Sequence, residues 1–140
     1  MKIVKSVLLV EDDIDDQYFF RSALNLIHPK VSCVVANNGV EALKLLKQLL
    51  PFDLIFMDLN MPMMNGFECI KNIKASENSK HIPVIIMSTS NHAGDIEMCS
   101  KLGALGYFTK PSNFDELFGK IETLISHVKN GNSYTFIQAG

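Results

Sequence analysis

Short apolar runs alternate along the chain with longer segments in which apolar residues recur every three or four positions. The short runs are Ser6 to Val10, Ser32 to Ala36, Leu54 to Met57, Val84 to Ser88 and Leu105 to Thr109. Continuous apolar runs of this length are typical of strands that are buried on both faces of a parallel sheet. Their alternation with helical patterns predicts βαβ units, which right-handed crossovers assemble most simply into a doubly wound α/β fold of five parallel strands and five helices.

Two helical segments carry both a start signal and an apolar stripe. Asn38, with Glu41 three residues later, predicts the start of the second helix, whose apolar face holds Ala42, Leu43, Leu46 and Leu50. Ser112, with Asp115 three residues later, is a capping pair that predicts the start of the last helix. The apolar stripe of this helix consists of Phe114, Leu117, Phe118, Ile121, Leu124, Ile125 and Val128.

Composition narrows the class of protein. The chain has 140 residues, 47% of them hydrophobic, which suits one well-buried core and is too short for two ordinary domains. A formal net charge of -2 and 13 scattered Lys and Arg residues give no basic surface, so we do not expect nucleic acid as a partner. No stretch approaches the roughly 20 apolar residues of a membrane span, and an acidic turn stands where a signal peptide would be cleaved. We therefore expect a cytoplasmic protein without a membrane partner.

Polar residues gather where the predicted strands end. Asp58 ends one apolar run directly before a loop that contains Pro and Gly, and Glu11 and Asp12 follow the first strand. Ser88 ends the fourth strand, and Lys110 follows the fifth. Because the carboxyl ends of these strands lie close together in a doubly wound sheet, we interpret these residues as one constellation.

Phosphoryl transfer to Asp58 would use every member of this constellation. An Asp carboxylate can attack a phosphoryl group and form an aspartyl phosphate. Mg²⁺, with Mn²⁺ as a substitute, would bridge the approaching anions, and Glu11, Asp12 and Asp58 supply the oxygen ligands that it prefers. Lys110 offers a point charge and Ser88 a hydroxyl donor to the phosphoryl oxygens. Each residue alone has an ordinary explanation, such as helix capping or a solvated loop, and only their joint placement favours this chemistry.

Four motifs surround these residues: Leu-Leu-Val-Glu-Asp-Asp at 8 to 13, Met-Asp-Leu-Asn-Met-Pro at 57 to 62 with Gly66, Pro-Val-Ile-Ile-Met-Ser at 83 to 88, and Gly-Tyr-Phe-Thr-Lys-Pro at 106 to 111. Over about residues 5 to 128 the chain resembles the receiver domains of two-component response regulators, the chemotaxis-type fold. The resemblance implies the flavodoxin-like strand order 2-1-3-4-5 and phosphorylation of Asp58 by a histidine kinase or a histidine phosphotransfer protein. It also implies that the backbone carbonyl of Asn60 completes the metal site and that the peptide bond between Lys110 and Pro111 is cis.

The resemblance further implies a switch. After phosphorylation the Ser88 hydroxyl would move toward Asp58 and leave space into which the ring of Tyr107 turns. This movement would reshape the surface formed by the fourth helix, the fifth strand and the fifth helix. That surface would control an unidentified downstream protein or join two copies in a homodimer. The chain would then be a signalling protein rather than an enzyme, with self-catalysed phosphorylation and dephosphorylation of Asp58 as its chemistry.

Two residues depart from the usual family pattern. Glu11 stands where many members have Asp, which leaves open whether its carboxylate binds the metal directly or through water. Thr89 follows Ser88 where a smaller residue is commoner, and we expect it to narrow the space available to Tyr107. Ser-Thr-Ser at 88 to 90 and Glu-Asp-Asp-Ile-Asp-Asp at 11 to 16 are similar to stand-alone regulators that pair with bacterial phytochromes.

We expect a receiver domain over residues 1 to 129 and a C-terminal tail over residues 130 to 140 that is too short for an output domain. Tyr134, Phe136 and Ile137 could add to a partner or to a second copy, or the tail could fray. Three other functions stay open: a receiver-like scaffold that takes no phosphate, a flavodoxin-like carrier of FMN, and a phosphatase with an aspartyl nucleophile. The acidic residues after the first strand disfavour an FMN phosphate, and Asn60 cannot act as the acid that a phosphatase needs.

Overall fold

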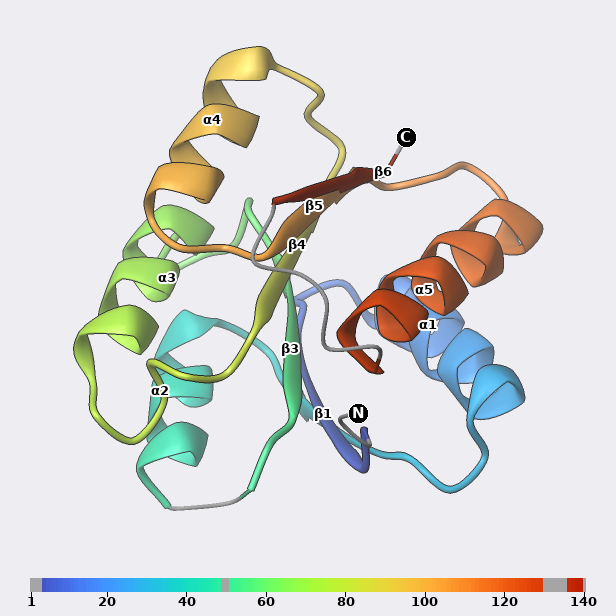
Figure 1. Cartoon of the computed structure of the whole chain (residues 1–140), viewed down its shortest axis with the longest axis horizontal. Coiled ribbons are helices and arrows are strands. Elements are labelled where there is room, and N and C mark those ends of the chain that lie inside the picture. Colours follow the sequence, from blue (N-terminus) through green and yellow to red (C-terminus); the bar gives the residue numbers. More distant parts are fainter. Residues whose placement is uncertain (1–3, 49–50, 130–135, 140) are drawn as a thin grey trace.

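A single parallel sheet forms the centre of the molecule in the computed structural model, which describes residues 4–48, 51–129 and 136–139 (Figure 1). Its strands are β1 (Ser6–Val10), β2 (Ser32–Ala36), β3 (Leu54–Asp58), β4 (Val84–Ser88), β5 (Gly106–Thr109) and β6 (Ile137–Ala139). Their order is β2-β1-β3-β4-β5-β6. The five predicted strands and their order are confirmed, and a sixth strand extends the sheet beyond β5.

Five helices cover the sheet, as predicted. They are α1 (Ile14–Ile27), α2 (Gly39–Lys47), α3 (Gly66–Ala75), α4 (Ala93–Lys101) and α5 (Phe114–Lys129). Figure 1 shows α1 and α5 side by side on one face of the sheet and α2, α3 and α4 on the other. No helix in the described part of the chain is long and apolar enough to cross a membrane.

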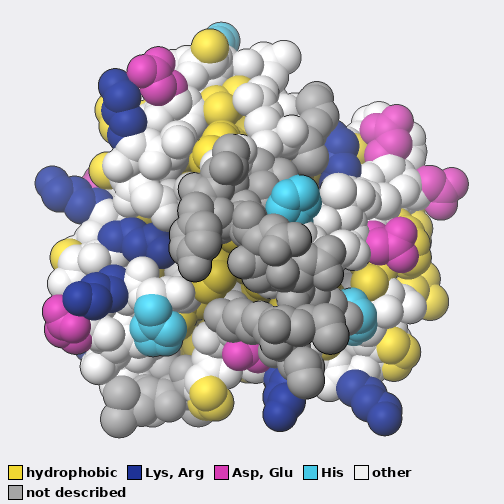
Figure 2. Space-filling model, in the orientation of Figure 1, with side chains coloured by type: hydrophobic (Ala, Val, Ile, Leu, Met, Phe, Trp, Pro, Cys, Tyr) yellow, Lys and Arg dark blue, Asp and Glu magenta, His cyan; other side chains and the backbone are white. Residues whose placement is uncertain are grey.

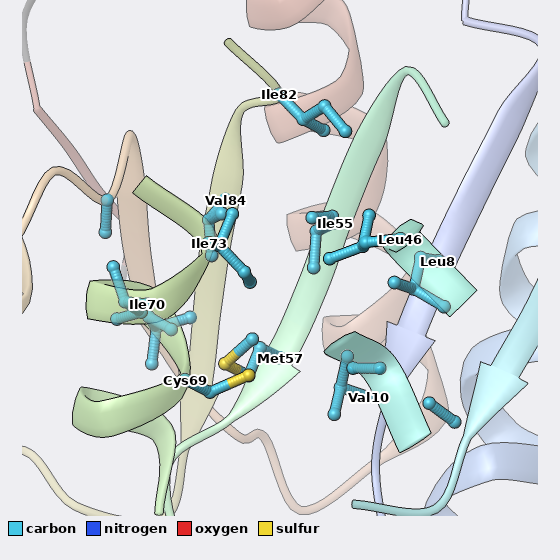
Figure 3. Packing of buried hydrophobic residues seen from close by; sticks show 14 of the residues in the cluster. Leu8, Val10, Leu46, Ile55, Met57, Cys69, Ile70, Ile73, Ile82 and Val84 are labelled. Atoms are coloured by element: carbon cyan, nitrogen blue, oxygen red, sulfur yellow. The ribbon is translucent and has the colours of Figure 1, made fainter. Parts of the chain in front are cut away.

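Two hydrophobic cores lie on the two faces of the sheet, because alternate strand residues point to opposite sides. In β1, Leu8 and Val10 belong to the core beneath α2, α3 and α4, whereas Val7 and Leu9 belong to the core beneath α1 and α5. Figure 3 shows the first core, into which strand residues point toward α2 and α3. Both cores continue up to the carboxyl ends of the strands, so the strand ends have rigid support.

Helix caps show one correct prediction and one error. Asn38 caps α2, since its side-chain oxygen accepts the Glu41 N–H at 2.9 Å. The last helix is capped by Asn113 and not by Ser112, because Asn113 Oδ1 accepts the Glu116 N–H at 2.9 Å. Asn is as good a cap as Ser, and the Asn113 carbonyl also accepts the N–H of Leu117 at 3.2 Å, which fixes the helix start one residue later.

The predicted apolar stripes pack on the sheet. In α5, Ile121, Leu124, Ile125 and Val128 are buried, and Phe114, Leu117 and Phe118 pack against the same core. In α2, Ala42 and Leu46 are buried in the core on the other face of the sheet, and Leu43 packs against that same core. Leu50 lies outside the described residues.

The described part of the C-terminal tail forms a strand, which corrects the expectation that it would fray or bind elsewhere. β6 runs parallel to β5, with Ile137 opposite Gly106 and Ala139 opposite Phe108. Phe136, just before β6, is partly buried against the first core. Without β6 the outer side of β5 would be a free sheet edge, whose unpaired backbone groups attract another strand. Tyr134 lies outside the described residues.

Charged side chains do not form a single patch on the face seen in Figure 2. Lys and Arg side chains are scattered around its rim, with Asp and Glu side chains among them. This distribution agrees with the near-neutral charge of the chain. The described Lys and Arg side chains on this face thus do not gather into one basic surface.

Candidate functional site

The sheet brings the predicted strand ends together. Asp58 lies opposite Met87, the residue before Ser88. Ser88 lies opposite Thr109, and its carbonyl accepts the backbone N–H of Lys110 at 2.7 Å. A polar cluster at the carboxyl edge of the sheet is therefore produced by strand pairing alone.

Asp58 is the last residue of β3, and its side chain is 8% exposed. Its Oδ1 accepts the N–H of Asn60 at 3.3 Å, and its Oδ2 accepts a hydrogen bond from Lys110 Nζ at 3.1 Å. Both carboxylate oxygens thus have a donor, which a buried carboxylate requires. The carboxylate is fixed in position and remains within reach of solvent.

Gly66 allows the loop after β3 to fold tightly behind this carboxylate. Its N–H donates to the Leu59 carbonyl at 2.8 Å, at the start of α3. A Cβ at position 66 would lie 2.8 Å from the Leu59 Cα and 3.0 Å from the Asp58 carbonyl oxygen, both closer than a side chain permits. The family motif glycine is therefore required by close backbone contact. The same loop contains Met63 with φ of 69°, the one non-glycine residue with positive φ in the described part of the chain.

Lys110 is the centre of the charged cluster. Its Nζ donates to Glu11 Oε1 at 2.7 Å, to Asp16 Oδ2 at 2.9 Å and to Asp58 Oδ2 at 3.1 Å. An ammonium group has three N–H donors, so these carboxylates use all of them. The Lys110 side chain is only 15% exposed, so it lies mostly within the protein.

Burial and ion pairing act in opposite directions on these groups. Burial raises the pKa of Glu11 to about 7, although its hydrogen bond with Lys110 opposes this rise. Burial disfavours the charged form of Lys110, but its hydrogen bonds with Glu11 and Asp16 raise its pKa above the usual value. We take Lys110 as the ammonium form, since three carboxylates surround it, and the Glu11 carboxylate as the more easily protonated partner.

Three carboxylates meet the requirements of a hard cation. Oxygen atoms of Glu11, Asp12 and Asp58, three of the four predicted metal ligands, lie within 4.8 Å of one another. Glu11 is fully buried and Asp12 is exposed, so the group opens to solvent on one side. Asn60 is exposed and donates its N–H to Asp58, and metal binding by its carbonyl remains a prediction.

Ser88 and Tyr107, the two residues of the predicted switch, lie beside each other. Ser88 is fully buried, its Oγ accepts the N–H of Ser90 at 3.1 Å, and its side chain also forms a hydrogen bond with that of Tyr107. The Tyr107 ring is 1% exposed, and its hydroxyl donates to the Ser90 carbonyl at 2.6 Å. Burial raises the pKa of this hydroxyl.

One expectation about this region is wrong and another stays a prediction. Thr89 is exposed whereas Tyr107 is buried, and an effect of Thr89 on the space around Tyr107 stays a prediction. The bond between Lys110 and Pro111 is not cis, since no peptide bond in the described ranges is. Trans is the lower-energy isomer of a bond before proline.

Asp16 belongs to the site, although it was not among the residues predicted for it. In the sequence it is one of several acidic residues that a helix N-terminus favours. Its contact with Lys110 joins positions 94 residues apart, which no local pattern reveals.

Comparison with known proteins agrees with this geometry. Residues 7–122 match the family model described as "Response regulator receiver domain". The chain belongs to this family. It is 33% identical to the polar-differentiation response regulator DivK of Brucella anthropi over 124 residues, which cover 89% of this chain and 96% of DivK.

Solved receiver structures are similar along most of the chain. The phosphorylated cyanobacterial phytochrome response regulator RcpA superimposes with a TM-score of 0.85 at 30% identity, covering 94% of this chain and 98% of RcpA. The Mn²⁺-bound form of response regulator Rcp1 gives a TM-score of 0.80 at 29% identity, covering 89% of this chain and 94% of Rcp1. The predicted similarity to phytochrome-partner regulators is thus confirmed.

Some curated relatives are much longer than this receiver domain. The chain spans 27% of a probable cyclic di-GMP phosphodiesterase of Vibrio cholerae, to which it is 32% identical. The shared part is the receiver domain, whose general function in this family is to be phosphorylated by a kinase. The comparisons therefore establish the family and its general function, and not the activity of the longer relatives.

Proposed function

We propose that Asp58 is the phosphoryl acceptor and that the chain transmits a signal through this modification. The observation that carries the proposal is the position of the Asp58 carboxylate: it ends β3, is 8% exposed and lies 3.1 Å from the Lys110 ammonium. Two further carboxylates, Glu11 and Asp12, lie within metal-bridging distance. This arrangement supplies a nucleophile, a cation and an oxygen-rich cradle for phosphoryl transfer.

The reaction forms one bond and breaks one. A lone pair of an Asp58 carboxylate oxygen forms the new bond to phosphorus while the bond between phosphorus and the donor breaks. For a phosphohistidine donor this is a P–N bond, whose electron pair remains on the histidine nitrogen. Lys110 and the Ser88 hydroxyl, which would exchange its hydrogen bond with Tyr107 for one to the phosphoryl group, then stabilise the phosphoryl oxygens.

Glu11, Asp12, Asp58 and the Asn60 carbonyl would hold Mg²⁺ or Mn²⁺, since hard cations favour oxygen ligands. Such an ion would neutralise charge between the acceptor carboxylate and the phosphoryl group. Lys110 already performs part of this role, because it neutralises Glu11 and Asp58. The remaining negative charge of the three carboxylates supports cation binding.

The output would pass through Ser88, Tyr107 and the face formed by α4, β5 and α5. Tyr107 is buried, and its hydroxyl donates to the Ser90 carbonyl. Phosphorylation would therefore stabilise an inward orientation that the ring can already adopt. The phosphodonor would be a sensor histidine kinase or a histidine phosphotransfer protein. A downstream protein, or a second copy in a homodimer, would bind the switched face. Residues 1–129 would form the receiver unit, and the tail would contribute β6 to this face.

A mass measurement tests the acceptor. We expect intact protein incubated with acetyl phosphate and Mg²⁺ to gain one phosphoryl group, and Asp58→Asn to gain none, because an amide is not a nucleophile for this step. The matched control is Asp15→Asn, which removes a carboxylate at the same end of the sheet from an exposed position. It should gain the group like the unmodified sequence, and a chelator should prevent the gain.

The alternatives give different results. A folded protein that gains no mass and does not bind beryllofluoride would be a scaffold, and this outcome would reject the proposal. Phosphate gained by Asp58→Asn would place the acceptor elsewhere. A yellow purified protein would support an FMN carrier, and steady turnover of a phosphate ester would support a phosphatase.

A further inference from the structure

Lys110 has no free N–H in the unphosphorylated protein. Glu11, Asp16 and Asp58 accept all three of its hydrogen bonds, at distances of 2.7, 2.9 and 3.1 Å. A phosphoryl oxygen on Asp58 that bonds to Lys110 therefore needs one of these carboxylates to leave. The exchange, rather than the bond alone, decides how much Lys110 contributes to phosphorylation.

Exposure decides which carboxylate can leave. The side chain of Glu11 is 0% exposed and that of Asp58 is 8% exposed, whereas that of Asp16 is 42% exposed. A buried carboxylate that loses its ion pair with Lys110 cannot regain water, so its charge stays unpaired and the loss is strongly destabilising. Asp16 can regain water, so its release costs least.

The surroundings of Asp16 also give it room to leave. A cavity of about 210 Å³ adjoins the Lys110 ammonium on the side of α1 and α5; its lining includes Asp16, Phe19, Lys110, Pro111, Phe114 and Leu117. A cavity of this size has space for several water molecules. The released carboxylate can therefore be hydrated beside its original position.

The backbone of Asp16 is nevertheless well fixed. Its N–H donates to the N-cap residue Asp13 at 2.9 Å. The next residue, Gln17, donates from its side chain to the Glu11 carbonyl at 2.6 Å and to Asn37 Oδ1 at 2.9 Å. These bonds attach the first turn of α1 to the ends of β1 and β2, so Asp16 is held over Lys110 by structure and not by chance.

We propose that Asp16 is a positioning residue that holds Lys110 in the unphosphorylated protein and releases it to the phosphoryl group. The inference rests on the proposed function, because it takes Asp58 as the acceptor. Asp16 competes with the phosphoryl oxygen for one N–H of Lys110. Its carboxylate thereby lowers the affinity of the site for a phosphoryl group.

The test is beryllofluoride binding at a fixed, saturating Mg²⁺ concentration, followed by fluorine NMR. Asp16→Asn keeps the shape of the side chain and weakens its hold on Lys110, so we expect the apparent affinity to rise about threefold to fivefold, the upper part of the range for one partly exposed charged contact. Asp15→Asn is the matched control: it removes the same charge from the same helical turn, at an exposed position. It should change the affinity less than twofold, in keeping with a screened surface charge.

Asp16→Glu separates the contact from an indirect effect on the fold. It restores the charge with a longer side chain, and we expect it to return the affinity to within about twofold of the unmodified protein, since its carboxylate can again reach Lys110. Urea unfolding of each variant confirms that the fold is retained. A purely structural role of Asp16 would not give a gain in affinity that the conservative variant reverses.

Each outcome has a definite meaning. Equal effects of Asp16→Asn and Asp15→Asn, or a loss of affinity in Asp16→Asn, would overturn the proposed release. If the unmodified protein itself binds no beryllofluoride and gains no phosphoryl group, the proposed function fails first. Binding by the unmodified protein with no difference between the two Asn variants rejects only the role of Asp16.

Discussion

Cys69 and Cys99 show how burial sets the chemistry of single residues. Both are fully buried, and burial raises the pKa of each thiol to about 12. Cys33, on β2, is partly buried, and burial raises its pKa to about 11 even though Arg21 lies near enough to lower it. A raised thiol pKa means less thiolate at any given pH, and the thiolate is the reactive form.

We expect the native protein to resist alkylation at Cys69 and Cys99. At pH 8 a thiol of pKa about 12 is ionised in roughly one molecule in 10,000, and this fraction rises about tenfold with each pH unit. Iodoacetamide treatment followed by peptide mass analysis measures the modification at each thiol. The urea-unfolded chain is the control and should react at all three cysteines. Fast native labelling of Cys69 or Cys99 would show that this core opens readily.

The site residues that could be predicted from sequence are those at strand ends. Asp58, Ser88 and Lys110 lie at neighbouring strand ends, as expected of a doubly wound sheet, and their roles in phosphoryl transfer stay predictions. Asp16 could not be predicted, since its role depends on which helix residue overlies Lys110. The burial of Tyr107 was not predictable either, because it depends on the Ser90 carbonyl accepting its hydroxyl.

At the scale of the elements, the start of α5 shows that sequence alone can offer two candidate N-cap residues. Ser112 and Asn113 are adjacent, both are exposed, and each has an acidic residue three positions later. Local sequence therefore does not choose between them. The structure uses Asn113, whose side-chain oxygen accepts the N–H of Glu116.

We expect Asn113→Ala to lower the free energy of unfolding by about 1 kcal/mol, since it removes an N-cap hydrogen bond. Ser112→Ala is the matched control and should change it by less than about 0.5 kcal/mol, as surface substitutions do. Chemical denaturation of both variants gives the comparison. A larger loss in Ser112→Ala than in Asn113→Ala would return the cap to Ser112.

Sequence patterns predicted the five core strands because their apolar runs are long enough to stand out from the surrounding helices. β6 was not predicted as part of the sheet. It has only three residues, and a strand so short is stable only because β5 offers it a partner. Its existence depends on the rest of the molecule, which local pattern does not contain.

At the scale of the whole molecule, β6 forms the edge of the sheet next to β5. It pairs along Gly106, Tyr107 and Phe108, so it lies directly beside the proposed switch residue. A partner of the α4, β5 and α5 face would therefore meet β6 as well as the helices. The tail is part of this face and not merely an appendage.

We expect a variant that ends at Lys129 to keep its fold and to exchange the outer amides of β5 faster. The outer amides are those that do not bond to β4, and deletion of residues 130–140 removes the strand that covers them. Hydrogen exchange measured by mass spectrometry compares this variant with the full chain. The amides of β3, in the middle of the sheet, are the internal control and should not change. Unchanged exchange in β5 would mean that β6 does not protect it in solution.

The arrangement of the helices also bears on the order in which the molecule folds. The helices that cover one core, α2, α3 and α4, follow one another along the chain, whereas the other core joins α1 to α5, which are distant in sequence. Closing a long loop costs more entropy than closing a short one, and contacts between distant segments slow folding. We therefore expect the core beneath α2, α3 and α4 to form before α5 docks on α1.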